Sequence, residues 1–305
     1  MIGVPYFYGG VAKINSDWLQ GMPLGIWLSD DTDFPIIGQF FEQDWMILFM
    51  SYSGMLLDLL IVPALLFKRT RLPGFLIIMS FHLMNAQLFT IGIFPWFMIG
   101  ATTLYFNSSW PRNLYNALRP STKQWKLVYA NEQLEAPSHL DKRQLIMVSL
   151  VTAWVFFQCA VPLRHFFIPG NPNWTEEGHR YSWHMKLRTK RALSVYKVVN
   201  KETGEVITTI DPQERLESWQ SRKMGRPYLV HRFCRMLAEE FKQNGLEVEI
   251  YPTVISTLNG RKYQDLIRGD IDLVNEPFPA SVPAKWIVPL ETPLSDRLDD
   301  YVNEN

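Results

Sequence analysis

Long apolar runs fill the first half of the chain, and dense charge fills the second half. Residues 45–67 (WMILFMSYSGMLLDLLIVPALLF) contain one formal charge, Asp58. About 20 apolar residues in helical conformation are enough to cross the hydrocarbon core of a bilayer. The pattern therefore predicts a transmembrane helix over 45–67. A basic cluster, KRTR at 68–71, follows it directly and favours the cytoplasmic side of a membrane.

A second apolar stretch covers 73–106 and carries no formal charge, with Gly92 and Pro95 near its middle. This length is long for one crossing and short for two, so the pattern predicts two short passes or a broken helical hairpin. Irregular backbone at membrane depth is tolerated where protein buries it or where it lines a cavity.

The segment 107–143 is polar and has more basic than acidic residues, which again favours the cytoplasm. Residues 144–163 are apolar and are expected to cross once more. Everything after His165 then lies outside, in the periplasm of a bacterium or in an organelle lumen.

The tail from 164 to 305 has the pattern of an α+β domain outside the membrane. Residues 193–210 alternate around Glu202-Thr203-Gly204, which predicts a hairpin. Residues 226–245 have helical apolar spacing and end at a glycine, and 247–256 indicate a further strand. The expected fold is a multi-pass α-helical membrane domain over 1–163, followed by an extramembrane, β-rich α+β domain over 164–305.

Composition narrows the function classes. The 30 basic and 30 acidic side chains cancel, so no electrostatic footprint for nucleic acid is expected. Cys159 and Cys234 have no metal-type neighbour, so two lone thiols are expected rather than a disulfide. The N-terminus has no basic region before its apolar run, and we expect the chain to begin inside a longer protein.

Polar groups within the apolar runs are the candidates for chemistry, because each is costly in lipid unless it is paired or faces a cavity. Lys13 follows an apolar, aromatic run. It is either a base whose pKa an apolar pocket lowers, or a helix-end lysine paired with Asp17. Asp58 is expected to pair with Lys13 or His82 or to form a structural bridge, and the structural role is favoured because a buried carboxylate usually persists through pairing.

His82 and Asn85 share a helical face in an otherwise apolar span, with Gln87 close by. They indicate either a polar site or a hydrogen-bond network that holds helices together. The segment 165–191 is dense in His, Trp, Tyr and Arg, which is typical of a site at the membrane surface or of an interfacial aromatic belt.

At these same residues the chain resembles the vitamin K-dependent γ-glutamyl carboxylase family. Lys13 aligns with the family's essential lysine, where the eukaryotic members have two adjacent lysines and this chain has Ala12 and Lys13. The histidine segment 81–92 resembles the family almost residue for residue. Weaker matches follow through the rest of the chain, at 54–59, 109–112, 173–175, 181–183, 258–261 and 270–274.

This resemblance implies a membrane enzyme of the carbon–carbon lyase class. In that family the lysine deprotonates vitamin K hydroquinone, and oxygen addition gives a strongly basic alkoxide. The alkoxide removes a γ-proton from a peptide glutamate, and CO2 traps the carbanion. The co-substrates implied are vitamin K hydroquinone, O2 and CO2, without a metal. The partners implied are membrane lipid and a glutamate-containing protein or peptide.

Site residues are carried over by position. The resemblance implies that Lys13 and His82 are catalytic. It places Tyr6, Asn85, His165 and Trp183 at the quinone, and Arg188 and Arg261 at the peptide substrate.

The chain also departs from the family pattern. His179 stands where the family has a tyrosine, Arg188 where it has a histidine, and Lys190 where it has an arginine. The upstream helices with their Asn-His pair are absent. Two alternatives therefore stay open: a quinone epoxidase relative that does not carboxylate protein, and a non-catalytic membrane fragment or binding protein.

Overall fold

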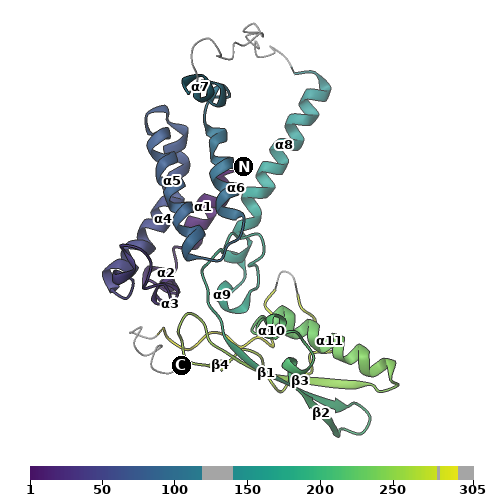
Figure 1. Cartoon of the computed structure of the whole chain (residues 1–305). Coiled ribbons are helices and arrows are strands. Elements are labelled where there is room, and N and C mark those ends of the chain that lie inside the picture. Colours follow the sequence, from purple (N-terminus) through teal and green to yellow (C-terminus); the bar gives the residue numbers. More distant parts are fainter. Residues whose placement is uncertain (119–139, 280–281, 295–305) are drawn as a thin grey trace. The chain divides into compact units, whose positions relative to one another are not determined.

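A computed structural model describes residues 1–118, 140–279 and 282–294 (Figure 1). The chain divides into two compact units. The first comprises Met1–Phe7 and Leu56–Ala160, and the second comprises Tyr8–Met55 and Val161–Asn305. Residues 8–55 thus group with the second half of the chain. A single domain boundary between residues 163 and 164 would place them with the first half instead. The proposed domain boundary at 163/164 stays a prediction.

The first unit is built from helices. Its long members are α4 (Asp44–Leu66), whose first half belongs to the second unit, α5 (Lys68–Leu88) and α8 (Lys142–Ala160), with the shorter α6 (Phe94–Thr102) and α7 (Trp110–Ala117) between α5 and α8. α4 is one uninterrupted helix across the predicted 45–67 segment. The start of α1 (Gly3–Ala12) joins these helices, since Tyr6 packs with Ile61, Ile78 and Met98 in one buried cluster.

The basic cluster at 68–71 begins α5 and also ends α4. The Arg71 guanidinium donates to the Leu65 and Leu66 carbonyls at 2.9 and 3.0 Å, and the Thr70 hydroxyl donates to Ala64 O at 2.7 Å. The last carbonyls of a helix have no partner within it, so these side chains satisfy groups that would be costly in lipid.

The predicted break in the 73–106 stretch is confirmed. α5 ends at Leu88, and α6 begins at Phe94 with Pro95 in its first turn. Gly92 between them has a φ of +58°, a conformation that favours glycine. The two helices pack against each other.

Two helical segments are long and apolar enough to cross a membrane, among the residues that the structure describes: Asp44–Leu66 and Lys142–Phe167. The second is α8 extended by the 3-10 turn η4 (Val161–Phe167). Only 6% of its most apolar stretch is buried within the protein, against 44% for α4. The core helix of a water-soluble domain would hide such residues, whereas most of this stretch is exposed.

The second unit contains a four-stranded antiparallel sheet in the order β2-β1-β3-β4. Its strands are β1 (Ala192–Asn200), β2 (Val206–Ile210), β3 (Val248–Ser256) and β4 (Gln264–Asp265). The predicted hairpin is confirmed: Tyr196 lies opposite Ile210 on β2 and opposite Pro252 on β3. Gly204, at a φ of +72°, makes the turn.

Helix α11 (Pro227–Gln243) packs against β3, as the helical spacing of 226–245 predicts. Its apolar side (Val230, Phe233, Leu237) is buried in one core with the sheet, and Arg232 on the other side is exposed. Cys234 lies in this core, and neither Cys234 nor Cys159 on α8 forms a disulfide, as expected from the sequence. The short elements of this unit are α2 (Ser16–Leu19), α3 (Leu24–Ser29), η1 (Gly38–Phe40), α9 (Pro172–Thr175), η5 (Pro212–Glu214) and α10 (Ser218–Ser221).

A buried ion pair joins the N-terminal part of this unit to its sheet domain. Arg261 donates from Nη1 and Nη2 to the two Asp17 carboxylate oxygens at 2.7 and 2.8 Å. Asn259 Nδ2 donates to the same carboxylate at 2.8 Å. Asp17 is 2% exposed and Arg261 is 8% exposed. Such a bidentate pair fixes the relative orientation of the two segments as well as their distance.

Breaking this pair is expected to destabilise the protein. Arg261→Gln leaves the Asp17 carboxylate buried without its cation, which costs about 3–5 kcal/mol when a buried pair loses one partner. The measurement is the unfolding midpoint of the detergent-solubilised protein.

The matched control is Arg268→Gln, which removes the exposed pair with Asp270 in the same domain. Its midpoint is expected to match that of the unmodified protein. Equal midpoints for the two variants would contradict a structural role for the Asp17–Arg261 pair.

Candidate functional site

Lys13 lies in the turn that follows α1. Its backbone N–H donates to Gly10 O at 3.1 Å, and its ammonium lies 5.2 Å from the centre of the Trp18 ring. Asn15 caps α2 by accepting from Trp18 N at 3.0 Å. The Trp18 indole donates to Ser51 O at 2.8 Å. The turn is therefore fixed on both sides of the lysine, which is half-buried.

Asp17, four residues after Lys13, is held by Arg261. Besides the two bonds to Asp17, the guanidinium donates to Thr292 O at 3.0 Å and to Leu258 O at 3.2 Å. Four of its five N–H groups are thus used within the protein. The observed contacts of Arg261 hold the turn that carries Lys13, and its binding of peptide substrate stays a prediction.

Tyr6 and His82 meet in the first unit. The Tyr6 hydroxyl lies 2.8 Å from His82 Nε2 and 3.4 Å from the Thr102 hydroxyl. Thr102 in turn donates to Met98 O at 2.6 Å. All three side chains are buried, at 4%, 3% and 0% exposure. Helices α1, α5 and α6, far apart in the sequence, contribute one residue each to this polar cluster.

Apolar rings surround His82. The ring centres of Phe81 and Phe94 lie 5.6 and 6.3 Å from that of the imidazole. The second ring nitrogen, Nδ1, is buried without a hydrogen-bond partner in the protein. A buried polar atom of this kind is uncommon and points to a missing partner. His82 therefore presents one hydrogen-bonding nitrogen without a protein partner to apolar surroundings.

Asn85 and Asp58 are the other polar candidates of this unit. Asn85 is half-buried, one turn beyond His82 on α5, and Asp58 is buried on α4 at 7% exposure. Tyr6, His82 and Asn85 therefore belong to one compact unit, whereas Lys13 and the remaining predicted site residues belong to the other.

Three histidines cluster in the second unit. The His165 and His184 rings are 4.6 Å apart, and His179 and His184 are 5.7 Å apart. His184 Nδ1 lies 3.2 Å from Asn173 Oδ1. The Nε2 atoms of His179 and His184 are buried without a partner in the protein.

Burial lowers the pKa of both His179 and His184, to about 4 and about 3, because the imidazolium loses solvation. The Arg188 guanidinium lowers both pKa values further, and the neighbouring imidazoles of His165 and His179 also lower that of His184. Both rings are therefore neutral near pH 7, and each keeps a nitrogen for a ligand.

A cationic pocket lies beside the histidines. It is a cavity of about 120 Å³ whose lining includes five basic side chains and one carboxylate, that of Glu176. We call it the basic pocket; its lining residues are Glu176, Arg188, Lys190, Arg222, Lys223, Gly225 and Arg226. Glu176 lies 3.4 Å from the Arg188 guanidinium and 3.6 Å from the Lys190 ammonium.

These charges are only partly compensated. Burial lowers the pKa of Lys190 to about 8; Glu176 opposes this shift, and Arg188 and Arg226 reinforce it. Burial also lowers the pKa of Arg188. Arg188 Nη1 is buried without a hydrogen-bond partner. Lys190 does have one, since it donates to Trp174 O at 2.8 Å.

The backbone beside the pocket is strained. Glu176, Tyr181, Trp183 and Lys186 have φ between +53° and +63°, the left-handed region that non-glycine residues seldom adopt. Two other non-glycine residues share that region among those described. Strain concentrated in one short segment is typical of a functional site. Trp183, a predicted quinone contact, is half-buried in this segment.

The basic pocket includes residues that the sequence reasoning missed, namely Glu176, Arg222, Lys223 and Arg226. A signal was present in the run Arg222 to Arg226. Cations there come immediately before a helix, where acidic residues are favoured by the helix dipole. No group of three or more His, Cys, Asp or Glu in the described ranges is arranged to hold a metal ion.

Two family profiles match the chain. The HTTM domain profile matches residues 1–110, and the profile of the lumenal domain of vitamin K-dependent gamma-carboxylase matches residues 143–293. No solved structure matches the chain.

The two profiles leave only 111–142 and 294–305 uncovered. Tyr6, Lys13 and His82 lie within the first match. The three clustered histidines, the basic pocket and Arg261 lie within the second match. The chain belongs to the vitamin K-dependent γ-glutamyl carboxylase family.

Proposed function

We propose that this chain is a membrane enzyme that couples oxidation of vitamin K hydroquinone to its epoxide with carboxylation of peptide glutamate. The observation that carries the proposal is the Tyr6–His82 hydrogen bond of 2.8 Å in an apolar cluster, with His82 Nδ1 buried and without a hydrogen-bond partner in the protein. Family membership supports the same activity.

Lys13 is the proposed base. A base that accepts a hydroquinone proton must be a neutral amine held in one place. The capped turn between α1 and α2 holds the backbone of Lys13 in place, as a positioned base requires.

Tyr6, His82 and Asn85 are the proposed contacts of the hydroquinone. When bound, the hydroquinone and O2 supply the strong base that removes the glutamate γ-proton. The protein must exclude water from that base, and the buried rings around His82 provide an apolar wall. The assignment of His165 and Trp183 to the quinone stays a prediction from the family resemblance.

The peptide glutamate is assigned to the basic pocket, with Arg188 as its principal contact. Arg188 Nη1 is buried without a protein partner, and a carboxylate is the natural acceptor for it. Only two of the five basic side chains, Arg188 and Lys190, lie within 4 Å of Glu176, so the pocket keeps positive charge for a substrate.

One observation favours a second candidate, quinone oxidation without carboxylation. His179, Arg188 and Lys190 depart from the family pattern, and all three lie in or beside the basic pocket. An altered peptide site would leave Lys13 and the Tyr6–His82 cluster in place. Separate measurement of epoxide and carboxylated product distinguishes the two functions.

The multi-pass topology belongs to the proposal. Asp44–Leu66 and Lys142–Phe167 are the two candidate spans, and the hairpin of α5 and α6 is proposed to enter the bilayer between them. The second domain is then periplasmic or lumenal, and membrane lipid is the immediate surrounding of α8.

Lys13→Ala is expected to lower epoxide formation from vitamin K hydroquinone by at least about 100-fold, the smaller end of what a positioned base contributes. The measurement is epoxide by chromatography, in membranes with equal amounts of protein. Lys201→Ala, at an exposed hairpin lysine, is the control. Unchanged turnover in the Lys13 variant would remove Lys13 as the base.

Arg188→Gln is expected to reduce carboxylation more than epoxidation, because a charge-assisted contact to the peptide carboxylate is lost. The KM for a glutamate peptide should rise about tenfold or more. Arg235→Gln, at an exposed arginine of α11, serves as the control. An equal loss of both products would argue against a peptide contact at Arg188.

A reporter fused after residue 305 tests the topology. We expect a reporter enzyme that works only outside the cytoplasm to be active at this position. The reason is that α8 is proposed to cross the membrane and place the second domain outside. Activity of a cytoplasmic reporter at the same position would overturn this orientation.

A further inference from the structure

The basic pocket carries more positive charge than a single glutamate requires. Five basic side chains line it, and Glu176 is the one carboxylate among its lining residues. Both ion pairs of Glu176, at 3.4 and 3.6 Å, are longer than the 2.7–2.9 Å of a tight charge-assisted hydrogen bond. Glu176 therefore binds its two partners loosely, and an incoming anion can compete for them.

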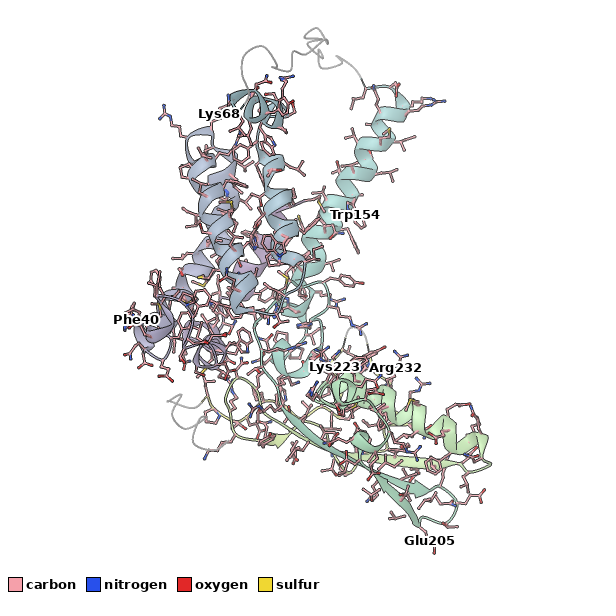
Figure 2. The ribbon with its side chains drawn as sticks, viewed as in Figure 1. Phe40, Lys68, Trp154, Glu205, Lys223 and Arg232 are labelled. Atoms are coloured by element: carbon pink, nitrogen blue, oxygen red, sulfur yellow. The ribbon has the colours of Figure 1, made fainter. Side chains whose placement is uncertain are left out.

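The position of the remaining cations adds to this excess. Arg226 is the residue before α11, and Arg222 and Lys223 precede it by only a few positions. The N-terminus of a helix carries a partial positive charge, so basic groups there repel it. An anion relieves this repulsion, and helix N-termini are established anion sites. Figure 2 labels Lys223, just before α11, and Arg232, on the same helix.

A second, independent observation points to a ligand. Arg188 Nη1 is buried without a hydrogen-bond partner, and the Nε2 atoms of His179 and His184 nearby are likewise buried and open. A buried guanidinium N–H without an acceptor costs free energy, and an oxyanion in the pocket would satisfy it.

We propose that the basic pocket selects a doubly charged oxyanion, and that this ligand is the geminal dicarboxylate of the γ-carboxyglutamate product. The assignment of the ligand depends on the proposed function, in which a monocarboxylate enters the reaction and a dicarboxylate leaves it. Carboxylation adds one negative charge at the same side chain. The pocket then binds the product more tightly than the substrate. The second carboxylate neutralises the positive charges of Arg222, Lys223 and Arg226, which Glu176 does not pair with.

The test measures binding to the full-length protein in detergent micelles by calorimetry, without turnover. Malonate is the dianionic probe and acetate the monoanionic one, followed by a γ-carboxyglutamate peptide and its glutamate counterpart. We expect the dianionic member of each pair to bind at least about tenfold more tightly, the effect of one added charge-assisted contact. Equal affinities within the pairs would overturn the proposal.

Variants locate the binding. Arg226→Gln and Lys223→Gln are expected to remove most of the preference for the dianion, and both positions are exposed, so the fold should tolerate them. Arg232→Gln, six residues further along α11 and outside the pocket, is the matched control and should keep the preference. A preference that survives both pocket variants would contradict this location.

The pH dependence gives a further readout. Burial lowers the pKa of Lys190 to about 8. The charged groups that act on Lys190 are Glu176, Arg188 and Arg226, and the charge of Lys190 in turn lowers the pKa of His179. An anion favours the ammonium form, so malonate affinity should fall as pH rises through about 8 and binding there should take up protons. Affinity that is flat from pH 7 to pH 9 would contradict the participation of Lys190.

Inorganic phosphate distinguishes the source of the anion. If phosphate binds tightly while the γ-carboxyglutamate peptide binds no better than the glutamate peptide, the pocket serves a phosphate or a lipid headgroup and the product assignment is wrong. Epoxide formation, measured on the same preparation, reports on the proposed function separately. Its absence together with dianion binding would reject that function but not the charge selectivity.

Discussion

The buried pair between Asp17 and Arg261 is the contact on which the rest of the second unit depends. The two residues are 244 positions apart in the sequence, and their side chains are almost completely enclosed. A buried ion pair is favourable only when its geometry is good and its remaining donors are satisfied. Here both carboxylate oxygens accept from Arg261, Asn259 adds a third donor, and carbonyls take two more guanidinium N–H groups.

This pair explains how a short turn can present a lysine in a defined position. The segment from Lys13 to Leu19 contains only one four-residue helix, α2. It is held by its cap at Asn15, by Trp18 on Ser51, and by Asp17 on the sheet domain. A change at Arg261 would therefore act on the turn that carries Lys13 through Asp17.

Both units exclude water from polar groups, but the surroundings of those groups differ between the two units. Around His82 the surroundings are apolar, and one polar cluster is fully enclosed by rings and aliphatic side chains. In the basic pocket, charged groups are brought together and partly buried, which lowers the pKa of Lys190 and keeps His179 and His184 neutral. The first environment suits a lipid-soluble hydroquinone, and the second suits a carboxylate.

The sequence predicted much of the fold, because the elements follow local patterns. The helix over 45–67, the break at Gly92 and Pro95, the hairpin around Gly204 and the helix ended by Gly245 all have period or turn signals. The grouping of residues 8–55 with the second half could not be predicted, since it depends on long-range contacts such as that of Asp17 with Arg261.

The candidate site was predictable only in part. The family pattern pointed to Tyr6 and His82, and the structure brings them within hydrogen-bond distance. The same pattern pointed to Arg261 but could not show its partner, because Asp17 is distant in sequence. Arg222, Lys223 and Arg226 were missed since a basic run before a helix resembles an ordinary solvated loop. Only their convergence with Glu176 and Arg188 makes them a pocket.

The most direct test of the central claim is a parallel assay on one sample of membranes that contain this chain, supplied with vitamin K hydroquinone, O2, labelled CO2 and a glutamate peptide. Epoxide and labelled peptide are quantified from the same reaction. We expect both products to appear together, and we expect the labelled peptide to disappear when hydroquinone is withheld. Absence of both products, from protein shown to be folded and inserted, would contradict the proposed coupling of epoxidation to carboxylation.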